Sequence, residues 1–156
     1  MIRIRRAEPD DAGLLLAWAN DPVTRAASFH PAPIDAASHA EWLRGRLQSP
    51  TTRLFIGLED DVPVGQVRLE ADADGRVEVA ISVAPAARRR GLGQALLAAT
   101  LVVGKADAGL GARVFVARTG PDNCSSIALF LRAGFHLAAA DQVCNGVPCL
   151  VYERPA

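Results

Sequence analysis

Hydrophobic residues alternate with polar ones at the start of the chain and again in its middle. Ile2 and Ile4 alternate with arginines, which is typical of a strand with one buried face. An apolar run over 54–58 and two alternating runs over 62–69 and 76–83 follow, and short polar turns separate them. Because their connections are short, these three consecutive strands are predicted to form an antiparallel meander.

Between the first strand and this meander, apolar residues recur at helical spacing. A first helix, which carries Trp18, is expected to begin after Pro9 and to stop at Pro22. Asp35 is suited to cap a second helix, which carries Trp42 on its apolar face. The pattern therefore predicts two helices joined by a proline-containing loop.

The second half of the chain alternates helices and strands. A helix is expected over 91–106, a strand over 113–117 and a further helix over 123–134. An Asn-Gly pair at 145–146 is typical of a tight hairpin turn between two final strands. The sequence thus predicts one α/β (α+β, mixed-sheet) domain over 1–156: strand, two helices, three antiparallel strands, helix, strand, helix and hairpin.

Composition and charge narrow the classes of function. Lys+Arg and Asp+Glu both total 17, so no net charge favours nucleic acid or an anionic membrane as a partner. No apolar run approaches the ~20 residues that span a bilayer, and the N-terminus does not resemble a signal peptide, so a cytoplasmic location is expected. Cys124, Cys144 and Cys149 lack metal-ligand spacing, and we expect neither a disulfide framework nor a zinc or other metal site.

A basic, glycine-containing segment stands between a predicted strand and a predicted helix. Its residues are Arg88, Arg89, Arg90, Gly91, Leu92, Gly93 and Gln94. The first N–H groups of a helix lack intrahelical partners, glycines allow close approach, and arginines suit phosphate. Neither a Rossmann fingerprint nor a P-loop fits the spacing. The segment predicts a phosphate or pyrophosphate site, and a solvated basic helix start is the alternative.

Two motifs carry a resemblance to a known family. Residues 77–85, followed by Arg-x-x-Gly-x-Gly at 88–93, resemble the acetyl-CoA-binding motif of the GNAT N-acetyltransferase superfamily. Asn123, followed by a helix that reaches Leu-Phe-Leu-Arg-Ala-Gly-Phe at 129–135, resembles the next motif of that family. The resemblance covers essentially the whole chain. It implies a GNAT-like fold with splayed central strands, acetyl-CoA as co-substrate and direct transfer of the acetyl group to an amine.

The resemblance also implies a set of cofactor contacts. Pantetheine amides would pair with backbone groups that the splayed sheet leaves open, at Ile81, Ser82 and Val83. The N–H groups of 89–94 would hold the pyrophosphate, and Asn123 would contact the cofactor or cap its helix. Phe130, also expected at the cofactor, stands where the family often has a tyrosine, and a phenyl ring has no proton to donate. No general acid is therefore assigned.

Glu78 is the candidate for the catalytic base. It stands near the expected acceptor and could take the ammonium proton through a water molecule, although a solvent-facing strand residue is the alternative. On the acceptor side, Trp18 and Trp42 could stack on a sugar or base and Arg25 could meet a phosphate. Both tryptophans at helical spacing are also consistent with core residues.

The acceptor is expected to be a small primary amine. The segments 18–25 and 39–43 are similar to a branch that includes acetyltransferases of nucleotide-linked amino sugars, as in pseudaminic acid synthesis, and enzymes acting on protein N-termini or polyamines. We therefore expect an amino-sugar acceptor first, with a protein N-terminal amine, a polyamine or an amino acid as alternatives. A catalytically weak acyl-CoA-binding sensor module is the alternative of another class. The sequence leaves homodimer formation open.

Overall fold

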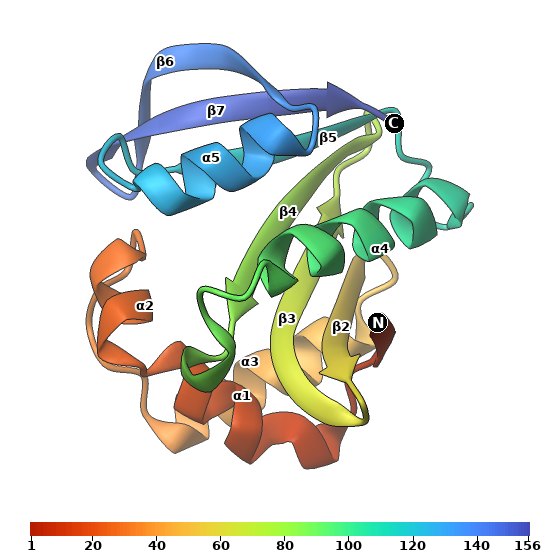
Figure 1. Cartoon of the computed structure of the whole chain (residues 1–156), viewed down its shortest axis with the longest axis vertical. Coiled ribbons are helices and arrows are strands. Elements are labelled where there is room, and N and C mark those ends of the chain that lie inside the picture. The colour runs from red at the N-terminus through yellow and green to blue at the C-terminus, as the bar shows by residue number, and fades with distance from the viewer.

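Seven strands form one mixed sheet, and helices cover both of its faces (Figure 1). The computed structural model describes all 156 residues. In chain order the elements are β1 (Ile2–Arg6), η1 (Pro9–Asp11), α1 (Ala12–Ala19), α2 (Pro22–Ala27), α3 (Ala36–Gln48), β2 (Thr52–Glu59), β3 (Val62–Ala71), β4 (Arg76–Val83), η2 (Pro85–Ala87), α4 (Leu92–Ala106), β5 (Val114–Thr119), α5 (Cys124–Arg132), β6 (His136–Cys144) and β7 (Val147–Pro155). The strand order across the sheet is β1-β2-β3-β4-β5-β7-β6.

The first four strands pair antiparallel, each with the next along the chain. The alternation of apolar and polar residues explains their orientation, because every second side chain of a strand faces the same side of the sheet. Along β3, for example, Val67 and Leu69 are fully buried while Arg68 between them is partly exposed. The predicted meander is therefore confirmed.

In the centre of the sheet, β4 and β5 are parallel but pair over a short stretch only. Arg76 to Glu78 lie opposite Val114 to Val116, and no pair follows, although β4 continues to Val83 and β5 to Thr119. The two strands diverge from there, which gives the V shape of Figure 1. We call this gap between the ends of β4 and β5 the split. The predicted splay of the central strands is confirmed.

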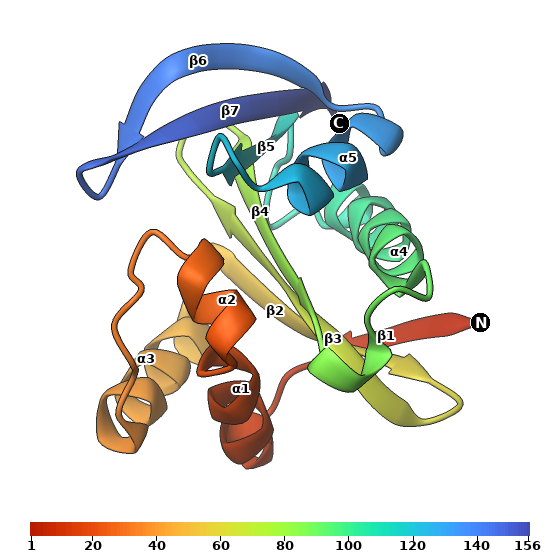
Figure 2. The same cartoon turned by 60° about the vertical axis from the view of Figure 1, so that its left-hand side comes forward.

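Each face of the sheet has its own hydrophobic core. Leu96, Leu97 and Leu101 of α4 and Phe130 of α5 pack with side chains of β3, β4 and β5 on one face. On the other face, α1 and α3 pack on β2 through residues such as Leu43. Figure 2 shows α4 and α5 on one side of the sheet and α1 to α3 on the other. The sheet thus separates a two-helix layer from a three-helix layer.

The helix α2 is one difference from the sequence expectation, which placed a loop after Pro22. The Asp21 side chain accepts a hydrogen bond from the N–H of Thr24 at 3.1 Å, and Pro22 occupies the first helical position. A capping aspartate followed by proline is a helix start. The same Asp-Pro pair therefore ends α1 and begins α2.

The other difference is a disulfide bond, and the expectation that the cysteines stay unpaired is wrong. Cys144 and Cys149 are joined, with their Cα atoms 5.8 Å apart, while Cys124 is free and exposed. The reason is the tight turn between β6 and β7, in which Asn145 has φ 49° and Gly146 has φ 77°, as the Asn-Gly pair predicts. This turn places the ends of the two strands side by side, and so brings the two sulfur atoms together.

Candidate functional site

The loop before α4 presents an uncapped helix start. Gly91 is the N-cap residue with φ 73°, no side chain caps the helix, and its first turn contains no acidic residue. The first N–H groups of a helix have no intrahelical partner, so those of α4 are available to an anion. A Cβ atom on Gly93 would lie 3.3 Å from Val83 Cγ2 and 3.6 Å from Leu129 Cδ1. The start of α4 therefore lies directly against the end of β4 and against α5.

Arg88 ties this loop to α2. Its Nη2 atom donates hydrogen bonds to Asp21 Oδ2 at 2.8 Å and to Thr24 Oγ1 at 3.1 Å. The Arg88 guanidinium, with the Thr24 N–H, holds the pKa of the Asp21 carboxyl below its usual value. Arg88 therefore joins the loop before α4 to the helix on the other side of the split.

The two following arginines differ in their partners. Arg90 is paired with Glu59, with 2.5 Å between Nη2 and Oε1, whereas Arg89 is exposed and forms no ion pair. Arg89 also has φ 64°, in the left-handed region that is uncommon for a residue with a side chain. Beside the uncapped helix start, Arg89 is the arginine of this loop whose charge is not already neutralised.

The split exposes one edge of each of its strands. Ile81, Ser82 and Val83 are partly exposed; they pair with β3 on one side and with no strand on the other. Unpaired strand edges carry N–H and C=O groups that need partners. An extended molecule with amide groups can pair with this edge.

The helix after the split places Asn123 and Phe130 differently. Asn123 caps α5, since its Oδ1 atom accepts hydrogen bonds from the N–H of Ser126 and from Ser125 Oγ, both at 3.3 Å. Phe130 is 3% exposed and packs edge-to-face on Phe135, with 5.1 Å between ring centroids. Its ring is part of the hydrophobic core.

Glu78 lies at the last pair before β4 and β5 diverge, on the face opposite α4. It accepts a hydrogen bond from Arg118 Nη1 at 2.5 Å, and its side chain remains 43% exposed. Around this pair lies a small hollow of about 90 Å³ with further charged residues, Glu70, Asp72 and Arg76. Sequence reasoning missed Arg118, although the alternation along β5 indicates that it points away from the core.

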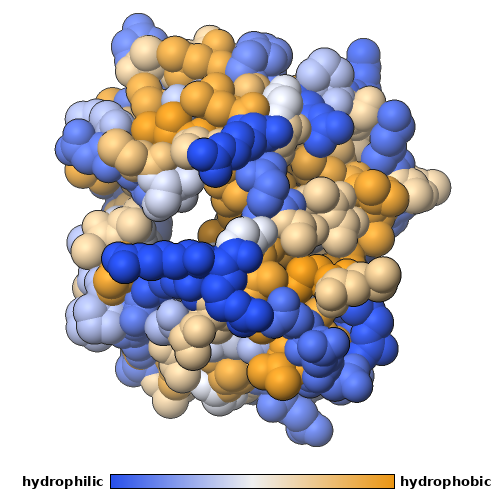
Figure 3. Space-filling view, in the orientation of Figure 1, coloured by the Kyte–Doolittle hydropathy of each residue, from blue (hydrophilic) through white to orange (hydrophobic).

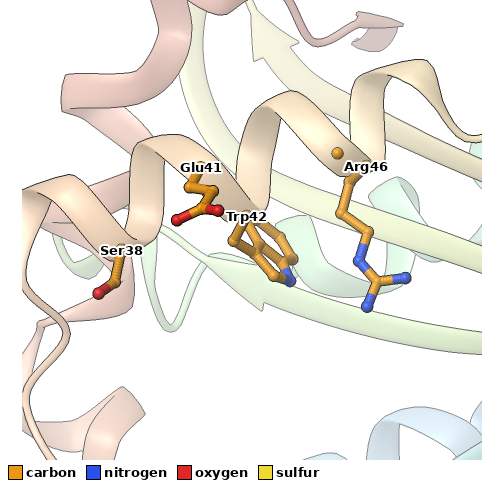
Figure 4. A pocket seen from close by; sticks show the side chains of 5 residues that line it. Ser38, Glu41, Trp42 and Arg46 are labelled. Carbon is orange, nitrogen blue, oxygen red and sulfur yellow. The ribbon is translucent and has the colours of Figure 1, made fainter.

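A larger hollow, of about 530 Å³, lies along one face of α3. Figure 4 shows Ser38, Glu41, Trp42 and Arg46 on this face, directed into the open space beside the helix. The centre of the Trp42 ring lies close to two guanidinium groups, 6.0 Å from that of Arg46 and 5.5 Å from that of Arg68. None of the ion pairs of the structure includes Glu41.

The two hollows are linked through one ion pair. Arg46, which lines the hollow at α3, is paired with Glu70, which lines the hollow at Glu78. Glu70 also lies opposite Glu78 in the register between β3 and β4. We call these two neighbouring polar hollows together the cleft, and Trp42 is the aromatic residue among those that line it.

A contact joins two segments that lie far apart in the sequence. Asn145 Nδ2, at the β6–β7 turn, donates a hydrogen bond to the carbonyl oxygen of Phe29 at 2.7 Å and lies 3.0 Å from His30 Nδ1. In the space-filling view an opening passes through the molecule, between the part that holds α5, β6 and β7 and the part that holds α2 (Figure 3). We call the contact of Asn145, which joins the β6–β7 turn to the loop after α2, the bridge.

Two residues predicted to bind substrate lie outside both hollows. Trp18 is 8% exposed and packs in the core under α1. Arg25 donates hydrogen bonds from Nε to the Ala19 carbonyl oxygen at 2.5 Å and from Nη1 to that of His30 at 2.6 Å. Arg25 holds the loop that Asn145 contacts. Of the three predicted residues, only Trp42 lines a hollow.

The structure contains no group of three or more His, Cys, Asp or Glu side chains placed to hold a metal ion. Its helices also lack the combination of length and apolarity that crossing a membrane requires.

Comparisons with known proteins agree with this architecture. The family model described as an acetyltransferase (GNAT) domain matches residues 2–136. Curated protein sequences give no significant match. Among solved structures, aminoglycoside acetyltransferase AAC(6')-Ib in complex with coenzyme A is similar with a TM-score of 0.86 and 16% identity, over 99% of this chain and 95% of that one.

Two further structures are similar over nearly their full length. Spermidine N-acetyltransferase from Vibrio cholerae, in complex with CoA and spermine, has a TM-score of 0.82 and 18% identity over 97% of this chain and 92% of that one. An N-acetyltransferase from Staphylococcus aureus Mu50 has a TM-score of 0.81 and 22% identity over 99% and 98%. At these identities the likeness concerns the fold.

Proposed function

Because the chain belongs to the acetyltransferase (GNAT) domain family and is an acetyl-CoA-dependent N-acetyltransferase, we propose that the split and the loop at 88–94 form its cofactor site. The uncapped start of α4 and the unpaired charge of Arg89 would hold the pyrophosphate. The open edge at Ile81, Ser82 and Val83 would pair with the amides of the pantetheine arm. These residues fit coenzyme A. The free N–H groups of α4 and the charge of Arg89 suit its pyrophosphate, and the unpaired edge of β4 suits the amides of its pantetheine arm.

On the other side of the split, we propose that the cleft binds a small acceptor with one primary amine, an amino sugar first. The observation that carries this proposal is Trp42, an aromatic ring that lines a hollow close to the guanidinium groups of Arg46 and Arg68. Aromatic side chains supply a large rigid surface with a polar edge, which suits the face of a sugar ring. Glu41, which has no ion-pair partner, would accept hydrogen bonds from the acceptor. A similar fold in an aminoglycoside acetyltransferase supports a sugar-bearing amine.

The charges of the cleft argue for one amine rather than several. Three carboxylates of the cleft region are neutralised by arginines, in the pairs Arg46–Glu70, Arg118–Glu78 and Arg76–Glu153. A polyamine with several ammonium groups would need several free carboxylates. Although a spermidine N-acetyltransferase shares the fold, only Glu41 and Asp72 among the carboxylates that line the two hollows lack an ion-pair partner, and this cleft favours a polar acceptor with a single amine.

Glu78 is proposed as the base that prepares the amine. Bound acetyl-CoA would supply the activated acetyl group as a thioester. Glu78 lies at the last pair before β4 and β5 separate, and its side chain lines the smaller hollow of the cleft. It would take a proton from the acceptor ammonium through a water molecule. Arg118 would fix the orientation of the carboxylate through their 2.5 Å contact.

Release of free CoA from acetyl-CoA tests this function across a panel of amines. The panel contains a free amino sugar, a nucleotide-linked amino sugar, spermidine, an amino acid and a peptide with a free N-terminus. We expect the highest kcat/KM with an amino sugar. Faster turnover of the peptide or of spermidine would overturn the acceptor assignment. Tight acetyl-CoA binding without turnover of any amine would favour a sensor module instead.

A further inference from the structure

Thr119, the last residue of β5, has a buried hydroxyl group without a partner. The residue is 3% exposed, and its Oγ1 atom is the one buried side-chain nitrogen or oxygen atom of the chain that forms no hydrogen bond. The other buried threonines, Thr52 and Thr100, both have hydroxyl partners. Burying a polar group without a hydrogen bond costs free energy, so buried polar groups in folded proteins are nearly always paired. An exception at the edge of a ligand site indicates a group that is completed by the ligand.

The position of Thr119 is at the split itself. The last pair between the strands joins Glu78 and Val116. Continued by three residues along both strands, this register would place Thr119 opposite Ile81, but here the strands have separated. Side chains alternate along a strand, so Thr119 lies on the same face as Phe115, which packs in the core with α4 and α5. The hydroxyl is thus on the helix-covered face, beside the gap that an extended molecule would fill.

The direction of the cofactor follows from the site proposed above. The pyrophosphate would lie at the start of α4, and Gly93 in that first turn lies against Val83. The pantetheine arm would therefore run from Val83 toward Glu78, where the acceptor is bound. Ile81 and Thr119, on the two separated strands, would flank this path near the reacting end of the cofactor.

We propose that the Thr119 hydroxyl binds the cysteamine end of the pantetheine arm of acetyl-CoA and so positions the thioester. This assignment rests on the proposed cofactor site in the split. A threonine hydroxyl has one donor and two acceptor lone pairs, so it can pair with an amide, a carbonyl oxygen or the sulfur. Because Phe130 offers no polar atom, Thr119 supplies the neutral hydrogen-bonding group on this side of the split.

The test is the isosteric substitution Thr119→Val, measured by calorimetric titration and thermal unfolding. In the ligand-free protein the midpoint of unfolding should stay the same or rise, because valine removes an unpaired buried hydroxyl. The Kd for acetyl-CoA should rise roughly 5- to 10-fold, the loss of one hydrogen bond. The Kd for adenosine 3′,5′-bisphosphate, which lacks the pantetheine arm, should not change. Thr119→Ser, which keeps the hydroxyl, should bind acetyl-CoA like the wild type.

Thr100→Val is the matched control. Thr100 is equally buried, but its hydroxyl donates to the Leu96 carbonyl oxygen at 2.8 Å within α4, so its loss should leave the Kd for acetyl-CoA unchanged. The proposal is overturned if Thr119→Val binds acetyl-CoA as tightly as the wild type, or if it weakens acetyl-CoA and the bisphosphate equally. Failure of the wild type to bind acetyl-CoA would instead contradict the cofactor site as a whole.

Discussion

The cofactor side and the acceptor side of the split are built in different ways. On the cofactor side, one continuous segment from β4 through the loop to α4 presents the strand edge, the free helix start and Arg89. On the acceptor side, the lining of the cleft comes from separate segments, namely α3 and the strands β3, β4 and β5. These segments meet through polar contacts such as Arg46 with Glu70.

The difference explains which half of the site a sequence can reveal. A pyrophosphate and an extended arm always need the same groups, namely free N–H donors and an open strand edge, and one local motif provides them. An acceptor can be any of many amines, and its site depends on side chains that only the fold brings together. The sequence of the cofactor side therefore identifies the family and its reaction, whereas the acceptor side determines which amine is acetylated.

The largest effect on catalysis is expected at Glu78, the proposed base. Glu78→Gln should lower kcat about 100-fold, in the range of a lost general base, with the greatest loss at low pH, where the amine is protonated. The pH profile of kcat measures this. Arg118→Met, which removes the ion-pair partner but keeps the Glu78 carboxylate, should lower kcat by less than Glu78→Gln does. A Glu78→Gln enzyme with the wild-type profile would remove the residue from the mechanism.

A bulky residue in the first turn of α4 should affect the cofactor side alone. In Gly93→Val the added atoms meet Val83 and the place proposed for the pyrophosphate, and the Kd for acetyl-CoA should rise about 30-fold, or about 2 kcal/mol. Calorimetric titration measures it. Gly13→Ala is the control, since Gly13 is exposed in α1 with open space around it, and this change should leave the Kd alone. Equal Kd values for both variants would contradict the assignment.

Removal of the Trp42 ring should weaken binding of the acceptor. Trp42→Ala should raise the acceptor KM about 10-fold, because the ring supplies much of the contact surface, and leave the Kd for acetyl-CoA unchanged. Trp18→Phe is the comparison within the same layer. Trp18 is in the core, so this change should lower the unfolding midpoint and preserve the KM. If Trp18→Phe raised the KM more than Trp42→Ala did, the cleft would be wrongly placed.

The smallest effect concerns the ion pair between Asp21 and Arg88, which joins α2 to the loop before α4. Asp21 has its pKa held below the usual value by Arg88, so the pair stabilises the fold above about pH 4. This contribution is lost as the pH falls through the lowered pKa, because the folded state must then take up a proton. Asp21→Asn keeps a helix cap but removes the charge. Its unfolding midpoint should fall slightly below that of the wild type at pH 7, and the two should converge in acid.

Much of the fold was predictable, because local patterns determine it. The strand alternation, the helix start after 88–90 and the Asn-Gly turn each depend on a few neighbouring residues, and the structure confirms the elements that they predict. The helix α2 was missed because Asp21-Pro22 was interpreted only as a stop, although a capping aspartate followed by proline also starts a helix. The Asp-Pro pair in the sequence was therefore sufficient to predict the start of α2.

The site was predictable only in part. The Arg88–Asp21 pair joins residues 67 positions apart, and no spacing rule predicts such a contact. The disulfide is an intermediate case, since the Asn-Gly turn brings Cys144 and Cys149 to neighbouring strand positions once the register is known. Thr119 is ordinary in the sequence, because only the missing hydrogen bond distinguishes it. Absence of a partner is a property of the folded chain.

The bridge between the β6–β7 turn and the loop after α2 depends on a chemically labile residue. An asparagine followed by glycine is prone to deamidation, and Asn145 precedes Gly146 at an exposed turn. Deamidation to aspartate would replace the Nδ2 donor by an oxygen acceptor facing the carbonyl oxygen of Phe29. Two acceptors repel, so aged protein should lose the bridge while its core remains intact. Mass spectrometry of the peptide that contains Asn145, followed over storage time alongside the acceptor KM, would show both changes together.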